Sequence, residues 1–243
     1  MKTKTIPKVG KLYVCRTEQF QHKQIVSDYI IDLITLSAKN AKKHIDITGN
    51  TTFCYGELQL HSVIVPAIAK LSDCFIMEYP ILRGKQNNSG RVDYYCVNKE
   101  GEANEYRLFL ELKSGRQGIP CAKLREQNVK LWKNVNIQLE GVSNEVKQYK
   151  DYYHKPVVRV CMEAITLYAD ESKFDKISPE VLTETLQTSI DTLTSQTGIA
   201  PNVSVLWQFH PDIVAGATDE YRDTRKFFGM LFLCRVIPPI LPK

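Results

Sequence analysis

The chain has 243 residues, of which 43% are hydrophobic and 24% are charged, an ordinary globular composition. A chain of this length can bury a core without help from disulfides or metals, and its composition excludes long-range disorder, collagen-like repeats and a coiled coil. The 32 basic and 27 acidic residues give a net charge of +5, which is compatible with a polyanionic partner without identifying one.

The sequence carries no sign of secretion or membrane insertion. No apolar run reaches the roughly 18 residues that a membrane-spanning helix needs, and the lysines of segment 1–15 are not followed by an apolar stretch. Seven scattered cysteines, without a CxxC pair or a Cys/His cluster, are typical of free thiols in a reducing compartment. We therefore expect a cytoplasmic protein with no membrane partner and no zinc site.

Hydrophobic periodicity predicts helices in the first part of the chain. Apolar residues recur at helical spacing from 17 to about 38 and again from about 57 to 71, where Pro66 is a candidate kink. The polar stretch 40–53 between them is predicted to be a loop.

The period then changes to that of strands. Short alternating runs at 75–82, 91–97 and 106–112, separated by polar turns at 83–90 and 98–102, predict a three-stranded meander. Later segments are predicted to be the helices 123–133, 142–153 and 179–196, with Ser178 as N-cap of the last, and the strands 157–168, 203–209 and 228–236. This order predicts a single α/β domain over 1–243, with a mixed sheet flanked by helices.

The meander carries the residues that indicate chemistry. Asp93 lies in its second strand, and Glu111 and Lys113 lie at the end of the third. Residues two apart in a strand share a face, and a hairpin can bring Asp93 beside them. Two carboxylates with a backbone carbonyl suit a hard divalent cation such as magnesium, and a nearby ammonium can hold the attacking water. This set indicates hydrolysis of a phosphodiester.

The motif Glu-x-Lys alone carries little information, because it occurs three times in the chain. Glu145–Lys147 lies in a predicted helix, where residues two apart face different ways, and Glu171–Lys173 lies in a polar loop. Only Glu111 and Lys113 end an apolar strand that follows another strand bearing an acid. Their position, rather than the tripeptide, singles them out.

With these residues the chain resembles the PD-(D/E)xK nuclease superfamily, which has the restriction-endonuclease-like fold. The core of that fold is a helix, a three-stranded meander, a helix and a strand, which matches 57–168 here. The segment 1–50 would be an N-terminal helical part, and 170–243 a C-terminal extension that adds strands to the mixed sheet. Val92 stands where the family often has a proline before its Asp.

Further motifs strengthen the resemblance. Glu57 matches an acid that the family often carries on the helix before the meander. Gln148 and Tyr152 match the Gln-x-x-x-Tyr motif of the branch that resembles RecB-type nucleases. The run Gly90-Arg91-x-Asp93 before Leu110-Glu111-x-Lys113 is similar to the nuclease domain of type I restriction subunits.

The resemblance implies a role for each matching residue. Asp93 and Glu111 would bind Mg²⁺ or Mn²⁺ together with the backbone carbonyl of Leu112, and Glu57 would reach the metal through water. Lys113 would position the hydrolytic water. Further roles are implied for Gln148, as a catalytic side chain that orients the nucleophile, and for Ser114, Arg116 and Tyr152, as contacts to nucleic acid.

The implied protein is a metal-dependent DNA endonuclease with a role in restriction or phage defence, and such nucleases often form homodimers. Two alternatives remain open, namely an effector nuclease that a ligand or partner activates, and a silent nucleic-acid-binding module with the same fold. Structural interpretations also remain open for single residues. Asp93 and Glu111 can form ion pairs with Arg91 and Lys113, and an acid at a helix start such as Glu57 is favoured by the helix dipole.

The five histidines show no ligand spacing and are interpreted as surface or packing residues. One of them, His61, follows Glu57 by four residues and can share its helix face.

Overall fold

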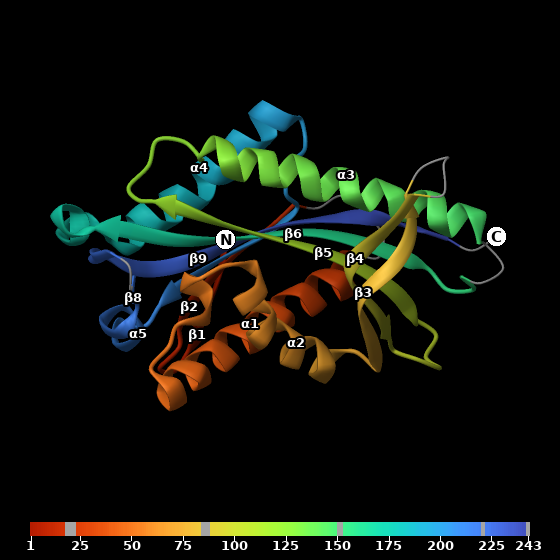
Figure 1. Cartoon of the computed structure of the whole chain (residues 1–243), viewed down its shortest axis with the longest axis horizontal. Helices are drawn as coiled ribbons and strands as arrows, with labels where there is room; N and C mark the ends of the chain where they lie inside the picture. The colour runs from red at the N-terminus through yellow and green to blue at the C-terminus, as the bar shows by residue number, and fades with distance from the viewer. Residues whose placement is uncertain (18–22, 84–87, 150–152, 220–221, 242–243) are drawn as a thin grey trace.

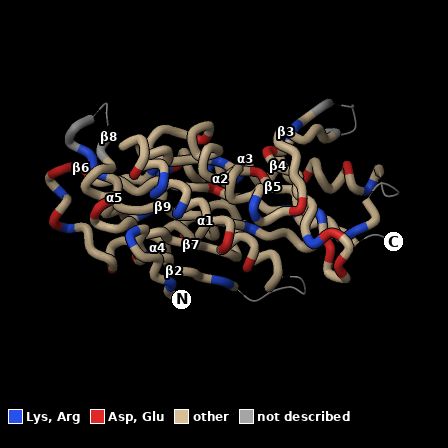
Figure 2. Tube along the Cα trace, turned by 90° about the horizontal axis from the view of Figure 1, so that it is seen from below, with Lys and Arg blue, Asp and Glu red and all other residues tan. Residues whose placement is uncertain are grey.

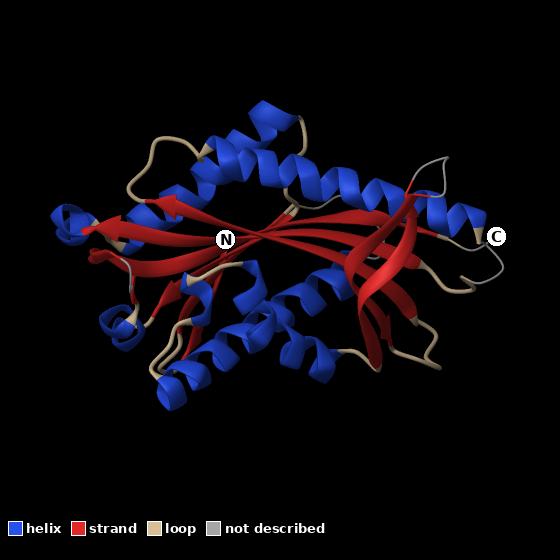
Figure 3. Ribbon diagram, viewed as in Figure 1, coloured by secondary structure: helices blue, strands red, loops and turns tan. Residues whose placement is uncertain are grey.

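The computed structural model describes residues 1–17, 23–83, 88–149, 153–219 and 222–241. Within these residues, nine strands form one mixed sheet in the order β1-β2-β7-β9-β6-β5-β4-β3, with β8 paired to β9. Helices α3 and α4 lie on one side of the sheet, and α1, α2 and α5 lie on the other (Figures 1 and 3). The prediction of an α/β chain with a mixed sheet flanked by helices is confirmed.

The N-terminal segment begins with a hairpin that the sequence pattern did not predict. Strand β1 (Lys2–Ile6) forms one edge of the sheet, and β2 (Gly10–Arg16) pairs with both β1 and β7 (Val203–Phe209). The first four residues of β1 are exposed, so the strand has no apolar period to reveal it. The predicted N-terminal helical part, 1–50, therefore also contains a β-hairpin.

Two helices in contact with each other cover one face of the sheet, as Figure 1 shows for α1 (Lys23–Thr48) and α2 (Glu57–Leu71). The bounds predicted for α2 are confirmed. The loop predicted for 40–53 was wrong over its first part, since α1 continues to Thr48. Tertiary contacts account for this extension, because Ala41 is buried and the Asn40 side chain donates to the carbonyl of Val63 at 3.0 Å.

The predicted meander is present as β3 (Cys74–Arg83), β4 (Asn88–Asn98) and β5 (Tyr106–Gly118). Residues 84–87 of its predicted first turn lie outside the described residues. Strand β5 runs parallel to β6 (Val157–Asp170), which in turn pairs antiparallel with β9 (Arg222–Ile240). The strands predicted near 157, 203 and 228 therefore all join the sheet that contains the meander.

The opposite face is covered by α3 (Glu126–Gln148) and α4 (Pro179–Thr197). Helix α3 is one helix where the sequence predicted two, because Val135, Leu139 and Val142 keep its buried stripe continuous. The predicted cap of α4 is confirmed, since the side chain of Ser178 accepts the N–H of Val181. The short elements are two 3₁₀ turns, α5 and β8, at Thr52–Cys54, Glu171–Lys176, Pro211–Gly216 and Thr218–Asp219.

The sheet separates two hydrophobic cores. One core contains Trp207 and the buried residues of α1 and α2, and the other contains Trp132 and those of α3 and α4. Among the helices that the structure describes, none combines the length and apolar character required to cross a bilayer.

Candidate functional site

The candidate site lies where β4 and β5 stop pairing. Their ladder begins at Asn98 and Tyr106 and ends at Tyr94 and Leu110, while β5 continues to Gly118 with β6 on its other edge. On the unpaired edge, carboxylates take the place of a neighbouring strand. These carboxylates accept the backbone N–H groups that the lost ladder would leave without partners.

The distances define this replacement. The N–H of Leu112 donates to Oδ2 of Asp93 at 2.6 Å, and the N–H of Ser114 donates to Oε2 of Glu57 at 3.1 Å. The N–H of Asp93 in turn donates to Oε2 of Glu111 at 3.3 Å. Asp93 and Glu57 thus bind the backbone of β5, and Glu111 of β5 binds the backbone of β4 in return.

Lys113 lies at the centre of these acids. Its Nζ is 3.0 Å from Oε1 of Glu111, 3.6 Å from Oε1 of Glu57 and 3.9 Å from Oδ2 of Asp93. It also donates to the carbonyl oxygen of Leu112 at 2.8 Å. The structure therefore brings together Glu57, Asp93, Glu111, Lys113 and the Leu112 carbonyl, all of which the sequence singled out.

Burial makes this cluster electrostatically unusual. The exposed fraction is 2% for the side chain of Glu111, 13% for Asp93 and 16% for Lys113. Burial and the neighbouring charge of Asp93 raise the pKa of Glu111 to about 7, although the ammonium of Lys113 opposes the shift. Burial also raises the pKa of Asp93. Glu111, Asp93 and the more exposed Glu57 thus share one ammonium.

The pKa of Lys113 also depends on the balance between burial and neighbouring charges. Burial alone would lower it, but the charges of Glu111, Asp93 and Glu57 outweigh burial, and the pKa is raised. Lys113 is therefore a cation at neutral pH. As an ammonium it can donate hydrogen bonds but cannot accept a proton.

Arg116 holds the chain segment that precedes Glu57. Its guanidinium donates to the carbonyl oxygens of Cys54 and Tyr55, which lie just before α2. Because Glu57 begins that helix, these bonds set its position relative to β5. The sequence predicted Arg116 and Ser114 as contacts to nucleic acid. In the structure, an Arg116 nitrogen and the Ser114 N–H both bond to the segment that carries Glu57.

The structure does not bring Gln148 to the cluster. Helix α3 runs antiparallel to β5, and the Oδ1 of its Asn136 accepts from Sγ of Cys161, the residue that pairs with Glu111. Gln148 ends the helix, exposed, twelve residues beyond Asn136, which is about 18 Å along the axis. Tyr152, its predicted companion, lies outside the described residues.

His61 is a neighbour of the cluster that the sequence undervalued. Its Nδ1 is hydrogen-bonded to the hydroxyl of Tyr94, and its charged form would lower the pKa of Asp93. The ring lies on α2 one turn after Glu57 and is partly exposed. The four-residue spacing from Glu57 was the available signal. The contact itself depends on how α2 packs against β4.

The oxygen atoms around Lys113 fit the chemistry of a hard divalent cation. The buried carboxylate of Glu111, the partly buried carboxylate of Asp93 and one carbonyl converge on a single position, which an ammonium fills. Lys113 would have to swing aside for a metal to bind the same oxygen atoms. Within the described ranges, no three His, Cys, Asp or Glu side chains already form a metal-binding group.

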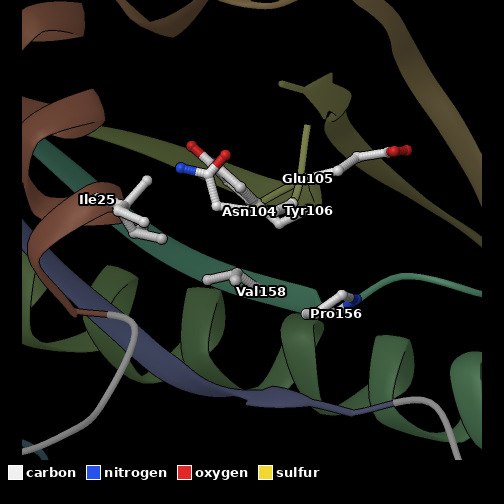
Figure 4. Close-up of a pocket in the computed structure, with 8 residues that line it drawn as sticks. Ile25, Asn104, Glu105, Tyr106, Pro156 and Val158 are labelled. Carbon is white, nitrogen blue, oxygen red and sulfur yellow. The ribbon is translucent and has the colours of Figure 1, made fainter. Parts of the chain in front are cut away.

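A small cavity lies away from this cluster. This cavity of about 50 Å³ lies between the start of α1, the start of β5 and β6 (Figure 4). Its polar wall is Glu105, whose carboxylate is bonded to the Gly101 N–H, Arg107 and Lys155. The Gly101 hydrogen bond and these cations lower the pKa of Glu105 to about 2. This carboxylate is thus already satisfied by the protein, whereas the acids around Lys113 share one ammonium.

Comparison of the chain with protein-family models, with curated proteins and with solved structures gives no match.

Proposed function

We propose that this protein is a metal-dependent nuclease that hydrolyses phosphodiester bonds of DNA, as an endonuclease of the PD-(D/E)xK kind. One observation carries the proposal. On the unpaired edge of β5, the carboxylates of Asp93 and Glu111 and the carbonyl of Leu112 surround the ammonium of Lys113. Glu111 and Lys113 are the acid-x-Lys pair that resembles the family motif.

The roles follow from position and charge. Asp93, Glu111 and the Leu112 carbonyl would hold Mg²⁺ or Mn²⁺, and Glu57 would act through a water molecule. When bound, the metal would lower the pKa of a water molecule and neutralise charge on the phosphate. Lys113, released from its ion pairs, would donate hydrogen bonds to the attacking water or to a phosphate oxygen. Arg116 would keep Glu57 in place.

The net charge of +5 is compatible with a DNA partner. Figure 2 shows Lys and Arg interspersed with Asp and Glu along the molecule. The acidic cluster would repel a phosphate until a cation balances it, because three carboxylates face one ammonium. We therefore expect DNA binding near this site to depend on the divalent cation.

The first test is cleavage of plasmid and single-stranded DNA in magnesium or manganese. We expect the wild type to cut, and the variants Asp93→Ala and Lys113→Ala to lose at least about a hundredfold in rate. Glu140→Gln, which changes an exposed carboxylate of α3, is the matched control and should retain activity. Melting curves of all four proteins would show whether a loss reflects the site or the fold.

The outcomes separate the alternatives. Cutting that survives both substitutions would reject the assigned site. A wild type that binds magnesium but does not cut would support an effector that needs an activating ligand or partner, provided that Asp93→Ala abolishes the metal binding in calorimetry. A wild type that neither cuts nor binds metal would support a non-catalytic module.

A further inference from the structure

The clearest unused polar group near the cluster is the outer ring nitrogen of His61. The Tyr94 residue is fully buried, and among the described residues its hydroxyl has one hydrogen-bond partner, Nδ1 of His61. A phenol is protonated at neutral pH, so the Tyr94 hydroxyl has a hydrogen to donate.

This contact favours the tautomer of His61 in which Nε2 carries the hydrogen. A buried hydroxyl needs an acceptor, and Nδ1 is the acceptor available to Tyr94 in the described part of the chain. When the imidazole is neutral and Nδ1 accepts, its hydrogen must be on Nε2. His61 therefore presents an N–H donor on its outer side. No protein partner for Nε2 is found among the described residues.

The placement of this donor relates it to the proposed site. His61 follows Glu57 by four residues on α2, which is one turn, or about 6 Å along the helix axis. Tyr94, which holds the ring, directly follows Asp93 in β4. A strand of nucleic acid with one phosphate at the carboxylates would extend past this helix turn. Its next backbone oxygen atoms would meet the Nε2–H.

We infer that His61 is a substrate-binding residue, whose Nε2–H donates to an oxygen of the nucleic-acid backbone beside the bond that is cut, with Tyr94 as the positioning residue that orients the ring. This inference rests on the proposed function and deepens it. It assigns His61 to substrate affinity rather than to the chemical step.

Two conservative substitutions separate the ring nitrogens. His61→Asn places an amide near the Nδ1 position, so it retains a partner for Tyr94 and loses the outer donor. His61→Gln places an amide nitrogen near the Nε2 position and retains the donor. We expect His61→Asn to raise KM for an oligonucleotide about tenfold with little change in kcat, and His61→Gln to recover most of that loss. Tyr94→Phe should give an intermediate KM.

The matched control is His44→Asn. His44 also bonds through Nδ1 to a hydroxyl, that of Thr48, but this hydrogen bond is exposed on α1. This variant should keep the wild-type KM. Equal losses in His61→Asn and His61→Gln, or a wild-type KM in His61→Asn, would overturn the assignment of His61.

A failure of the proposed function can be distinguished from a failure of the His61 assignment. If the wild type binds the oligonucleotide without cutting it, the dissociation constants of the same variants decide the His61 assignment, measured by fluorescence anisotropy. If the wild type neither cuts nor binds in magnesium or manganese, both proposals are rejected. If it cuts normally and only the His61 pattern is missing, the nuclease proposal stands alone.

Discussion

Replacing Glu111 by glutamine is expected to abolish activity and to stabilise the folded protein at alkaline pH. The variant loses one charged ligand of the proposed metal site, which we expect to cost at least about 10³-fold in cleavage rate. The same change removes a carboxylate that is almost fully buried beside Asp93. Function and stability therefore make opposite demands on this residue.

The direction of the stability effect follows from the pKa. The pKa of Glu111 is about 7 in the folded protein, against 4.5 for an ordinary glutamate. A raised pKa means that the fold favours the protonated acid. The protonated side chain of Glu111 therefore contributes stability that is fully present below about pH 4.5. This contribution is lost as the pH rises through about 7. The difference corresponds to an effect on the order of 3 kcal/mol.

Urea unfolding at pH 4.5 and pH 8 measures this effect. From pH 4.5 to pH 8, the free energy of unfolding of the wild type should decrease by up to about 3 kcal/mol more than that of Glu111→Gln. Glu140→Gln, an exposed change on α3, should follow the wild type in both stability and cleavage. A pH dependence identical to that of the wild type would show that Glu111 does not titrate in this range.

Replacing Glu163 by methionine is expected to raise the free energy of unfolding by about 2 kcal/mol at pH 7. Glu163 is completely buried in β6, and both of its carboxylate oxygens lack a hydrogen-bond partner among the described residues. Burial raises its pKa well above the usual value. Methionine has a similar size and no polar atom that needs a partner.

The melting temperature measures this second effect, with an expected rise of about 5 °C for a chain of this length. Glu163→Gln keeps an unpartnered polar group and should gain less. Glu184→Met, an exposed position on α4, is the matched control and should change the melting temperature little. A lower melting temperature for Glu163→Met would mean that the carboxyl group has a stabilising partner.

The sequence predicted the elements whose signal is local. Helix α2 and the meander follow from the change of hydrophobic period, and the cap at Ser178 follows from residue type. The end of α1, residues 39–48, and the continuity of α3 were missed because burial of Ala41 and Leu139 outweighs their polar neighbours. The edge strand β1 was missed because it has no buried face over most of its length.

The same distinction applies to the candidate site. The proximity of Asp93, Glu111 and Lys113 could be predicted because strand alternation and one hairpin fix their relative positions. The position of Gln148 could not be predicted, since it depends on the direction in which α3 crosses β5. The contact between His61 and Tyr94 required the packing of a helix on a strand, which no spacing within either element reveals.

The replacement of a strand by side chains along β5 has a consequence for amide hydrogen exchange. The amides of Leu112 and Ser114 are held by single carboxylates, whereas alternation directs the amide of Lys113 towards β6. A rotation of Asp93 or Glu57 is therefore enough to release the first two, without opening the sheet. These two amides should exchange faster than that of Lys113, so their exchange rates would report directly on the state of the acidic cluster.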